Sequence, residues 1–237
     1  MKQTLLRIGL PAGTLLYASR FRELVARLPN MPAMLFNRGE DRRTLPSTPT
    51  VRFVGGRQWV GILADPGHEG LVYDVMGAAV RAVTQEISKA VPVSVEEHEL
   101  GVKSCQWPVR YWIREMAIKR RTDVRRAAST HDLVAELLLR DIEAQAERFG
   151  LDMPTRDQLD LFVEVVNEKG LRLQTTSGVT NEYVHLVNAS VDVNAEMRGI
   201  WFAGNLTSRG YGRIGRDLDR LAVHAPLEER LPRKMVA

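Results

Sequence analysis

The sequence has little cysteine, because Cys105 is the one cysteine in 237 residues. A single cysteine excludes an internal disulfide and a zinc site built from several cysteines. No stretch of 18 or more apolar residues occurs, so we expect neither a membrane-spanning helix nor a membrane partner. Arg7 interrupts the apolar residues near the N-terminus, so we expect no secretory signal peptide. These features together favour a cytoplasmic protein.

Motifs for metal-dependent and cofactor-dependent chemistry are missing as well. The phosphate-binding motif Gly-x-x-x-x-Gly-Lys-Ser/Thr does not occur, and no spacing of histidine, aspartate and glutamate is typical of a metal site. We therefore expect no metal and no cofactor. The first 67 residues contain no histidine; the five histidines are His68, His98, His131, His185 and His224. We interpret His68, His98, His131 and His185 as structural or exposed rather than catalytic.

The positive charge is concentrated in one segment. The whole chain carries a net charge of +4, whereas residues 103–126 hold eight basic and two acidic residues and are +6 by themselves. A localised positive segment is typical of a site that binds a polyanion. An alternative is a charged face that only contacts solvent.

The first hundred residues predict a ferredoxin-like unit. The expected elements are a strand over 4–10, a helix from Ser19 to Leu28, a hairpin of strands 51–54 and 58–63 around Gly55-Gly56-Arg57, a helix over 72–87 and a strand over 93–100. The paired glycines are typical of a tight hairpin turn, and the helices follow apolar residues at helical spacing. The order strand, helix, strand, strand, helix, strand is the ferredoxin-like pattern.

The middle of the chain predicts a basic helical arm over 101–153. We expect two helices within 106–150, and the second has an apolar face from Leu133 to Phe149. On the first, four arginines would share one stripe that is some 22 Å long at about 1.5 Å per residue, which could follow a phosphate backbone. The candidate RNA-binding residues of the arm are Arg110, Arg114, Lys119, Arg120, Arg121, Arg125 and Arg126.

The last part, residues 154–237, is predicted to be rich in β-strands. Residues 159–166 fit either a strand or a short helix, while 183–193 and 197–206 fit strands joined by a turn at 194–196. Five glycines fall within 199–215, where they would let backbone amides approach phosphates. The alternative is a tight loop after a strand. The candidate RNA-binding residues here are Arg209, Gly210, Tyr211, Gly212 and Arg213.

A strand followed by the loop Ser-Arg-Gly-Tyr-Gly-Arg near the C-terminus, together with a ferredoxin-like first half, resembles the RAMP superfamily of CRISPR proteins. In size and layout the chain is most similar to the guide-RNA-processing endoribonucleases, and the inserted arm is similar to the type IV branch. This resemblance implies an α+β fold of the RRM or RAMP type with a ferredoxin-like N-terminal domain over 1–100. The arm and a second β-rich half would follow it.

The resemblance also implies an activity and partners. Such enzymes bind the repeat stem-loop of precursor CRISPR RNA and cut on its 3′ side through the substrate's own 2′-hydroxyl, without a metal. Many keep the mature CRISPR RNA and join other CRISPR effector subunits. The glycine-rich loop also occurs in noncatalytic members, so an RNA-binding scaffold subunit is the alternative. An unrelated protein that binds DNA through the arm is a third possibility.

The chain departs from the family at the catalytic position. Family members often place a histidine in or near the first helix, where this chain offers Tyr17, Arg20, Arg22 and Arg38. Arginine stays protonated, so it is a poor general base, but its fork of donors suits a pentacoordinate phosphate. We therefore predict Arg22 and Arg38 as phosphate stabilisers, assisted by Tyr17 or Arg20. The alternative is that these are surface arginines or arginines that bind the RNA backbone.

Overall fold

The computed structural model describes residues 1–39, 41, 45, 48–119, 128–174 and 181–217, without the side chains of 171–174 and 181–183. Its elements are β1 (Lys2–Gly9), α1 (Ala18–Ala26), η1 (Ala33–Phe36), β2 (Val51–Gly56), β3 (Trp59–Ala64), α2 (Glu69–Ile87), β4 (Val93–Glu99), β5 (Gly101–Ile118), α4 (Thr130–Arg148), η2 (Arg156–Gln158), β6 (Leu161–Gln174), β7 (Asn181–Arg198), β8 (Trp201–Phe202), η3 (Thr207–Arg209) and β9 (Arg213–Gly215). Among the described helices, none is both long and apolar enough to cross a membrane.

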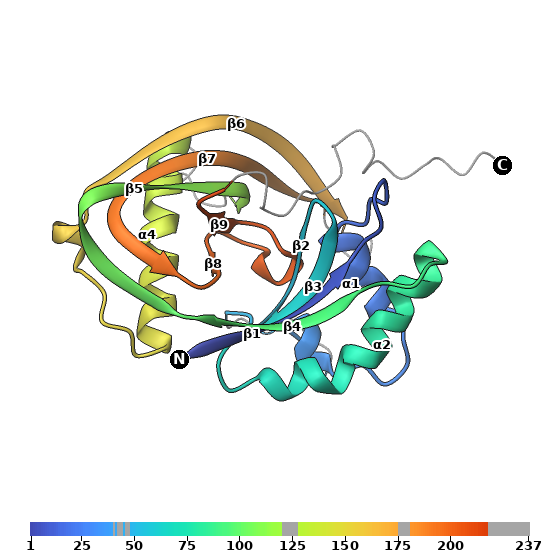
Figure 1. The fold of residues 1–237 in the computed structure, drawn as a ribbon. Helices are drawn as coiled ribbons and strands as arrows, with labels where there is room; N and C mark the ends of the chain where they lie inside the picture. The colour runs from blue at the N-terminus through green and yellow to red at the C-terminus, as the bar shows by residue number, and fades with distance from the viewer. Residues whose placement is uncertain (40, 42–44, 46–47, 120–127, 175–180, 218–237) are drawn as a thin grey trace.

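The first sheet has the strand order β2-β3-β1-β4 with antiparallel pairing throughout, and α1 and α2 lie on one of its faces (Figure 1). Along β1 the side chains alternate between the two faces. Leu6 and Ile8 pack against Phe21 of α1 and the apolar face of α2, whereas Leu5 faces the other way, toward Phe202 of β8. The ferredoxin-like prediction for the first hundred residues is confirmed.

The hairpin turn lies two residues later than predicted. Gly55 and Gly56 belong to β2 and do not have positive φ, and Arg57 and Gln58 form the connection to Trp59. A Cβ atom on Gly56 would lie 2.2 Å from Nε1 of Trp59. The glycine therefore makes room for the indole ring instead of forming the turn.

The second sheet has the order β6-β7-β5-β9-β8, and its first four strands follow the same plan as the first sheet. β5 corresponds to β1, α4 to α1, and the β6–β7 hairpin to β2–β3. Where the first unit has α2, the second has the loop 199–212, which contains β8 and η3. The second half is therefore a ferredoxin-like unit in which a loop replaces the second helix.

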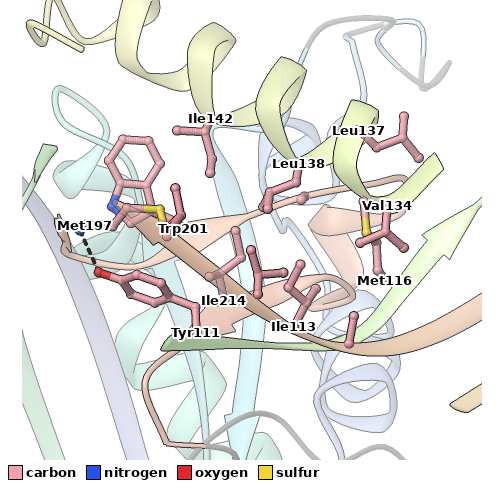
Figure 2. Packing of buried hydrophobic residues seen from close by; sticks show 14 of the residues in the cluster. Tyr111, Ile113, Met116, Val134, Leu137, Leu138, Ile142, Met197, Trp201 and Ile214 are labelled. Atoms are coloured by element: carbon pink, nitrogen blue, oxygen red, sulfur yellow. Dashed lines mark hydrogen bonds between the residues drawn. The ribbon is translucent and has the colours of Figure 1, made fainter. Parts of the chain in front are cut away.

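The core of the second half lies between α4 and the sheet (Figure 2). Leu137, Leu138 and Ile142 of α4 pack against Ile113 and Met116 of β5. Burial of each such side chain contributes about 1.5–3 kcal/mol. The predicted second helix of the arm is therefore confirmed as α4, but it covers a sheet instead of pairing with another helix.

The prediction of a basic first helix within 106–150 is wrong for its described part, because residues 106–118 belong to β5. The alternation decides this: Tyr111 and Ile113 are buried, whereas Arg110 and Trp112 on either side of Tyr111 are not. A period of two fits a strand. A register shift between Ile113 and Met116 then returns Met116 and Ile118 to the core. The sequence periodicity was blurred by this irregularity.

Two further expectations in the C-terminal part are settled. Residues 161–166 belong to strand β6, preceded by the short helix η2, so the strand alternative holds. The predicted turn at 194–196 is wrong, because β7 runs through it to Arg198. Val193, Ala195 and Met197 bury alternate side chains there, and the amide of Asn194 binds the carbonyl oxygen of Gln158 at 2.9 Å.

Candidate functional site

The glycine-rich loop 199–212 packs against both halves of the molecule (Figure 1). A Cβ atom on Gly210 would lie 2.5 Å from the carbonyl oxygen of Phe53 in β2, and one on Gly212 would lie 1.8 Å from that of Ala203. Both glycines have positive φ, 85° and 73°. Close backbone packing and the left-handed conformation together require glycine at both positions.

The backbone amides of these glycines are already engaged. The N–H of Gly210 donates to the carbonyl oxygen of Thr207 at 3.0 Å, and the N–H of Gly212 donates to that of Arg114 at 3.0 Å. The expectation that they face a phosphate is therefore not met in this structure. Tyr211, a candidate RNA-binding residue, is 5% exposed and packs with Val184 and Leu186. These three residues hold the loop in place.

Three arginines from three separate segments come together beside this loop. Arg22 lies on α1, Arg38 follows η1, and Arg209 is the last residue of η3. The pKa of Arg22 is lowered to about 10, first by desolvation and then by the charges of Arg209 and Arg38. The contact between α1 and η3 brings the elements of Arg22 and Arg209 together. The predicted pair is thus joined by an arginine of the glycine-rich loop.

The environment of Arg22 leaves its charge largely uncompensated. Its guanidinium lies 5.3 Å from the ring centroid of Phe36 and donates to the carbonyl oxygen of Phe36 at 3.5 Å. Its Nε is buried without a hydrogen-bond partner. Within the described ranges, none of these three arginines forms an ion pair with a carboxylate. We call Arg22, Arg38 and Arg209 the arginine cluster; a bound phosphate would relieve its repulsion.

Arg20 and Tyr17 have other contacts. Arg20 donates to Glu86 of α2 at 2.9 and 3.1 Å and to Glu23 at 3.3 Å, and these hydrogen bonds raise its pKa. Its charge is therefore compensated, and it ties α1 to α2. Tyr17 is the N-cap residue of α1, where its carbonyl oxygen accepts the N–H of Phe21 at 2.8 Å. The assisting roles of both residues stay predictions.

A cleft of about 390 Å³ opens next to the arginine cluster. Asn37 and Ser208 line it, and they are the chain neighbours of Arg38 and Arg209. On the α4 side it is lined by Arg140 and Asp141. Asp141 accepts the N–H of Gly204 at 2.6 Å, which fixes the loop against α4. The cleft therefore lies where both halves and the loop meet.

A family model described as "Type IV CRISPR-associated endonuclease Csf5" matches residues 1–218. The chain belongs to this family. A search of the curated protein sequences gives no match.

Solved structures agree with the family assignment. A chain described as "Csf5, CRISPR-Cas type IV Cas6 crRNA endonuclease" is 32% identical, with 94% of this chain and 100% of that chain covered and a TM-score of 0.77. A crystal structure of Cas6b is 15% identical over 92% of this chain and all of its own, with a TM-score of 0.58, and shares the fold. The predicted RAMP-type fold and the type IV branch are therefore confirmed.

Arg213 follows the glycine-rich loop, in β9. It is half-buried, its guanidinium lies 5.1 Å from the ring centroid of Trp59, and it donates to the carbonyl oxygen of Gly55 at 3.3 Å. Desolvation, and then the charge of Arg7, lower its pKa to about 10. It lines a second cleft of about 730 Å³ together with Arg7 and His98. Arg213 therefore lines a different cleft from the one beside Arg209.

The basic residues predicted for the arm are spread over β5 and the segment after it. Arg110 forms a two-pronged ion pair with Asp192 of β7, at 2.8 and 2.7 Å. Arg114 lies opposite Arg213 in the β5–β9 register, and Lys119 lines the 390 Å³ cleft. The single helical stripe is wrong for Arg110 and Arg114. The other predicted RNA-binding residues, Arg120, Arg121, Arg125 and Arg126, lie outside the described residues.

The polar residues that join the two halves were not predicted from the sequence. Gln145 of α4 is 5% exposed and donates to the carbonyl oxygen of Phe202 at 2.8 Å. Asp65 is 2% exposed and accepts from Arg52 at 2.8 Å, from Gln3 at 3.2 Å and from Arg148 of α4. One signal was available, because Gln145 is a polar residue within the apolar face of α4.

Among the described residues, no group of three or more histidine, cysteine, aspartate or glutamate side chains could hold a metal ion. Of the described histidines, none lines the 390 Å³ cleft. His98 lines the second cleft, where desolvation lowers its pKa, and His185 contacts Glu168 on the β6–β7 hairpin. The polar groups that line the cleft beside the arginine cluster are therefore arginine, lysine, amide, hydroxyl and carboxylate groups, with no imidazole among the described residues.

Proposed function

We propose that the chain is a metal-independent endoribonuclease that binds the repeat stem-loop of precursor CRISPR RNA and cleaves on its 3′ side. The observation that carries this proposal is the arginine cluster, in which Arg22, Arg38 and Arg209 converge without a carboxylate partner in the described part of the chain. Family membership supports an RNA substrate, since the related solved protein is described as a crRNA endonuclease.

In the proposed reaction the 2′-oxygen of the substrate attacks the neighbouring phosphorus. A 2′-oxygen–phosphorus bond forms, the bond from phosphorus to the 5′-oxygen of the next nucleotide breaks, and a 2′,3′-cyclic phosphate and a 5′-hydroxyl result. One proton leaves the 2′-hydroxyl and one is taken up by the departing oxygen. The intermediate phosphorane carries more negative charge than the starting diester, so fixed cations that surround it stabilise the transition state selectively.

The chain's own residues supply the fixed charge. The pKa of Arg22, lowered to about 10, still leaves its guanidinium protonated at neutral pH. The hydrogen bond to Phe36 and the ring beneath it hold Arg22 in one orientation, which reduces the reorganisation needed when the charge develops. Arg38 is exposed and Arg209 is half-buried, so both can reach a phosphate at the surface. Tyr17 remains a proposed assisting residue.

We further propose that the basic residues on β5 and after it contact the stem. Arg114 and Lys119 are the described members of this set, and Arg120, Arg121, Arg125 and Arg126 are its other proposed members. Contacts to phosphates would supply affinity that falls as the salt concentration rises. Such contacts would also keep the processed RNA bound, so that the chain enters an effector complex together with other CRISPR subunits.

The second candidate function is a noncatalytic RNA-binding scaffold subunit. One observation favours it: no described histidine lines the cleft beside the arginine cluster, and none contributes to the pKa shift of Arg22. A clamp that lacks a histidine as general acid or base can bind a phosphate with little acceleration of its cleavage.

The test incubates pure protein with a radiolabelled repeat hairpin in the presence of a chelator. Cleavage that stops when the nucleotide at the cut carries a 2′-deoxy sugar, with a cyclic phosphate on the 5′ product, supports the endoribonuclease. Tight binding without cleavage supports the scaffold. A duplex DNA competitor that removes the RNA would contradict both.

A further inference from the structure

We propose that the 390 Å³ cleft beside the arginine cluster binds a single nucleobase that carries an exocyclic amine, namely the base of a nucleotide next to the phosphate held by that cluster. The inference rests on the proposed function, because it assumes that an RNA strand lies at the arginine cluster. It adds a binding pocket and its specificity-determining residues, Asn205 and Ser208 with Asn37 and Arg140.

The position of the cleft supports this occupant. Asn37 and Ser208 line it, and each is directly bonded along the chain to a member of the arginine cluster. A strand whose phosphate contacts Arg38 and Arg209 therefore has its adjoining nucleotide at the mouth of the cleft. A volume of about 390 Å³ is at the lower end of the roughly 300–1,000 Å³ found for ligand pockets, which suits one base better than several.

The lining combines apolar surface with fixed polar groups, as a nucleobase site requires. Leu45, Phe202 and Leu206 contribute apolar walls, which a bare phosphate would not need. Most of the charged groups around the cleft already have partners: Arg52 binds Asp65, and Asp141 binds Arg140 and Gly204. Lys119 also lines the cleft and supplies a cation for a neighbouring phosphate, while the rest of the lining suits a largely neutral base.

The hydrogen-bonding groups suggest which bases fit. The side-chain nitrogen of Asn37 donates to the carbonyl oxygen of Leu45 at 3.2 Å, and that of Asn205 donates to the carbonyl oxygen of Ala117 at 3.1 Å. A carbonyl oxygen can only accept, so both amides are fixed with nitrogen toward the backbone. Each keeps its side-chain oxygen as an acceptor for a ligand. Adenine, cytosine and guanine each offer two amine hydrogens to such a pair of acceptors, whereas uracil has no amine and offers only its N3–H.

The backbone of the cleft is strained where it meets the ligand position. Leu206 has φ 63° and ψ 22°, a left-handed conformation that a branched side chain rarely adopts. Such strain persists where the surrounding structure enforces it, and it is frequent at binding sites. Here it comes directly before Thr207 and Ser208 and turns the loop along the cleft wall. Within the described chain, the hydroxyl of Ser208 has no hydrogen-bond partner, so it too is available.

The test is a thermodynamic cycle in which the binding affinities of protein variants for intact and modified RNA are compared. The probe is the repeat hairpin with 2′-deoxy sugars across the 3′ base of the stem, which prevents cleavage, and an abasic site is moved through that stretch one nucleotide at a time. We expect one position at which loss of the base weakens binding roughly five- to a hundredfold. At that position we expect uracil to bind roughly three- to tenfold more weakly than the best amine-bearing base.

The variants are Ser208→Ala and Asn205→Ala, with Ser94→Ala on β4 as the control. Each cleft variant should weaken the intact RNA and reduce the effect of the abasic site, while its affinity for the abasic RNA matches that of the unmodified protein. Ser208→Ala removes a hydroxyl with no partner in the described structure, so it should fold even if Asn205→Ala does not. The control should keep the full abasic effect.

Two results would overturn the proposal. One is an abasic scan in which every position binds alike; the other is an abasic effect that both cleft variants retain in full. Failure of the protein to bind any form of the hairpin would instead remove the proposed function, and the pocket with it. Because the RNA cannot be cleaved, the outcome does not depend on whether the chain is an enzyme or a scaffold.

Discussion

The two ferredoxin-like halves differ in one element. The first half covers its sheet with α1 and α2, whereas the second has α4 and, in the place of a second helix, the loop 199–212. A helix satisfies its own backbone groups and can remain on the outside of one unit. The loop instead finds partners in both halves, through Gln3, Asp141 and Gln145. The loop that stands in the place of a second helix thus joins the halves and carries Arg209.

The largest expected effect comes from the buried charge that joins the halves. Asp65→Asn should lower the free energy of unfolding by about 3–5 kcal/mol, because Arg52 would remain buried without its charged partner. Urea unfolding measures this. Glu97→Gln, which breaks the exposed pair with Lys2, is the control and should change the free energy of unfolding little. Similar values for both variants would mean that Asp65 is not what holds the halves together.

Gly212→Ala tests whether the loop needs its close backbone contact. The Cβ atom would lie 1.8 Å from the carbonyl oxygen of Ala203 at a φ of 73°, so we expect a loss of roughly 2–5 kcal/mol in unfolding free energy. Gly13→Ala is a matched control, because Gly13 also has positive φ, 80°, but nothing lies within 4 Å of the added atom. It should lose only about 1 kcal/mol. If the two variants are equally stable, steric contact is not the reason for glycine at 212.

Arg38→Ala addresses the chemistry at the junction. Removal of one preorganised donor to a developing charge should slow cleavage by about 10²–10³. The affinity for the uncleavable hairpin should fall much less, because the remaining cluster still attracts the phosphate. Single-turnover cleavage measures the rate, and filter binding measures the affinity for the uncleavable hairpin. Arg27→Ala, an exposed arginine at the C-cap of α1, is the control. Equal losses in rate and affinity would make Arg38 a binding residue only.

The smallest expected effect is a pH dependence of stability that comes from Arg22. Its pKa is lowered to about 10 in the folded state, chiefly by desolvation, while the unfolded chain keeps a higher value. The native state then releases a proton that the unfolded state retains, so stability gains as the pH rises through about 10. Urea unfolding at pH 8 and pH 10.5 should show this gain relative to Arg22→Gln. A difference between the two proteins that is constant with pH would contradict it.

Much of the fold could be predicted from the sequence, because most helices and strands follow from local patterns of apolar residues. The apolar spacing of α2 and α4, the hairpin 51–64 and the final strand of the first unit were all predicted from periodicity. The wrong prediction of a helix for residues 106–118 has a local cause. β5 contains two register shifts, between Ser104 and Val109 and between Ile113 and Met116, and these interrupt the alternation that identifies a strand. What remained resembled a helix with arginines at a spacing of four.

The candidate site was only partly predictable. Arg22 and Arg38 were named from their chemistry near the first helix, and Arg209 from its place beside the glycines, but nothing in the sequence placed the three together. The glycines were expected to expose amides, yet Gly210 and Gly212 allow backbone to pack against Phe53 and Ala203. Asn205 and Ser208 carried no signal, because isolated polar residues occur in every loop.

The amino-acid sequence by itself determined most of the segments that form helices and strands, where the chain is basic, and that the region of the first helix offers arginines and no histidine. Those properties depend on residues a few positions apart. Tertiary structure alone decided that Arg209 meets Arg22 and Arg38 while Arg213 lies in another cleft. That outcome depends on how residues 199–212 fit between two sheets, a contact between segments more than a hundred residues apart that no local pattern encodes.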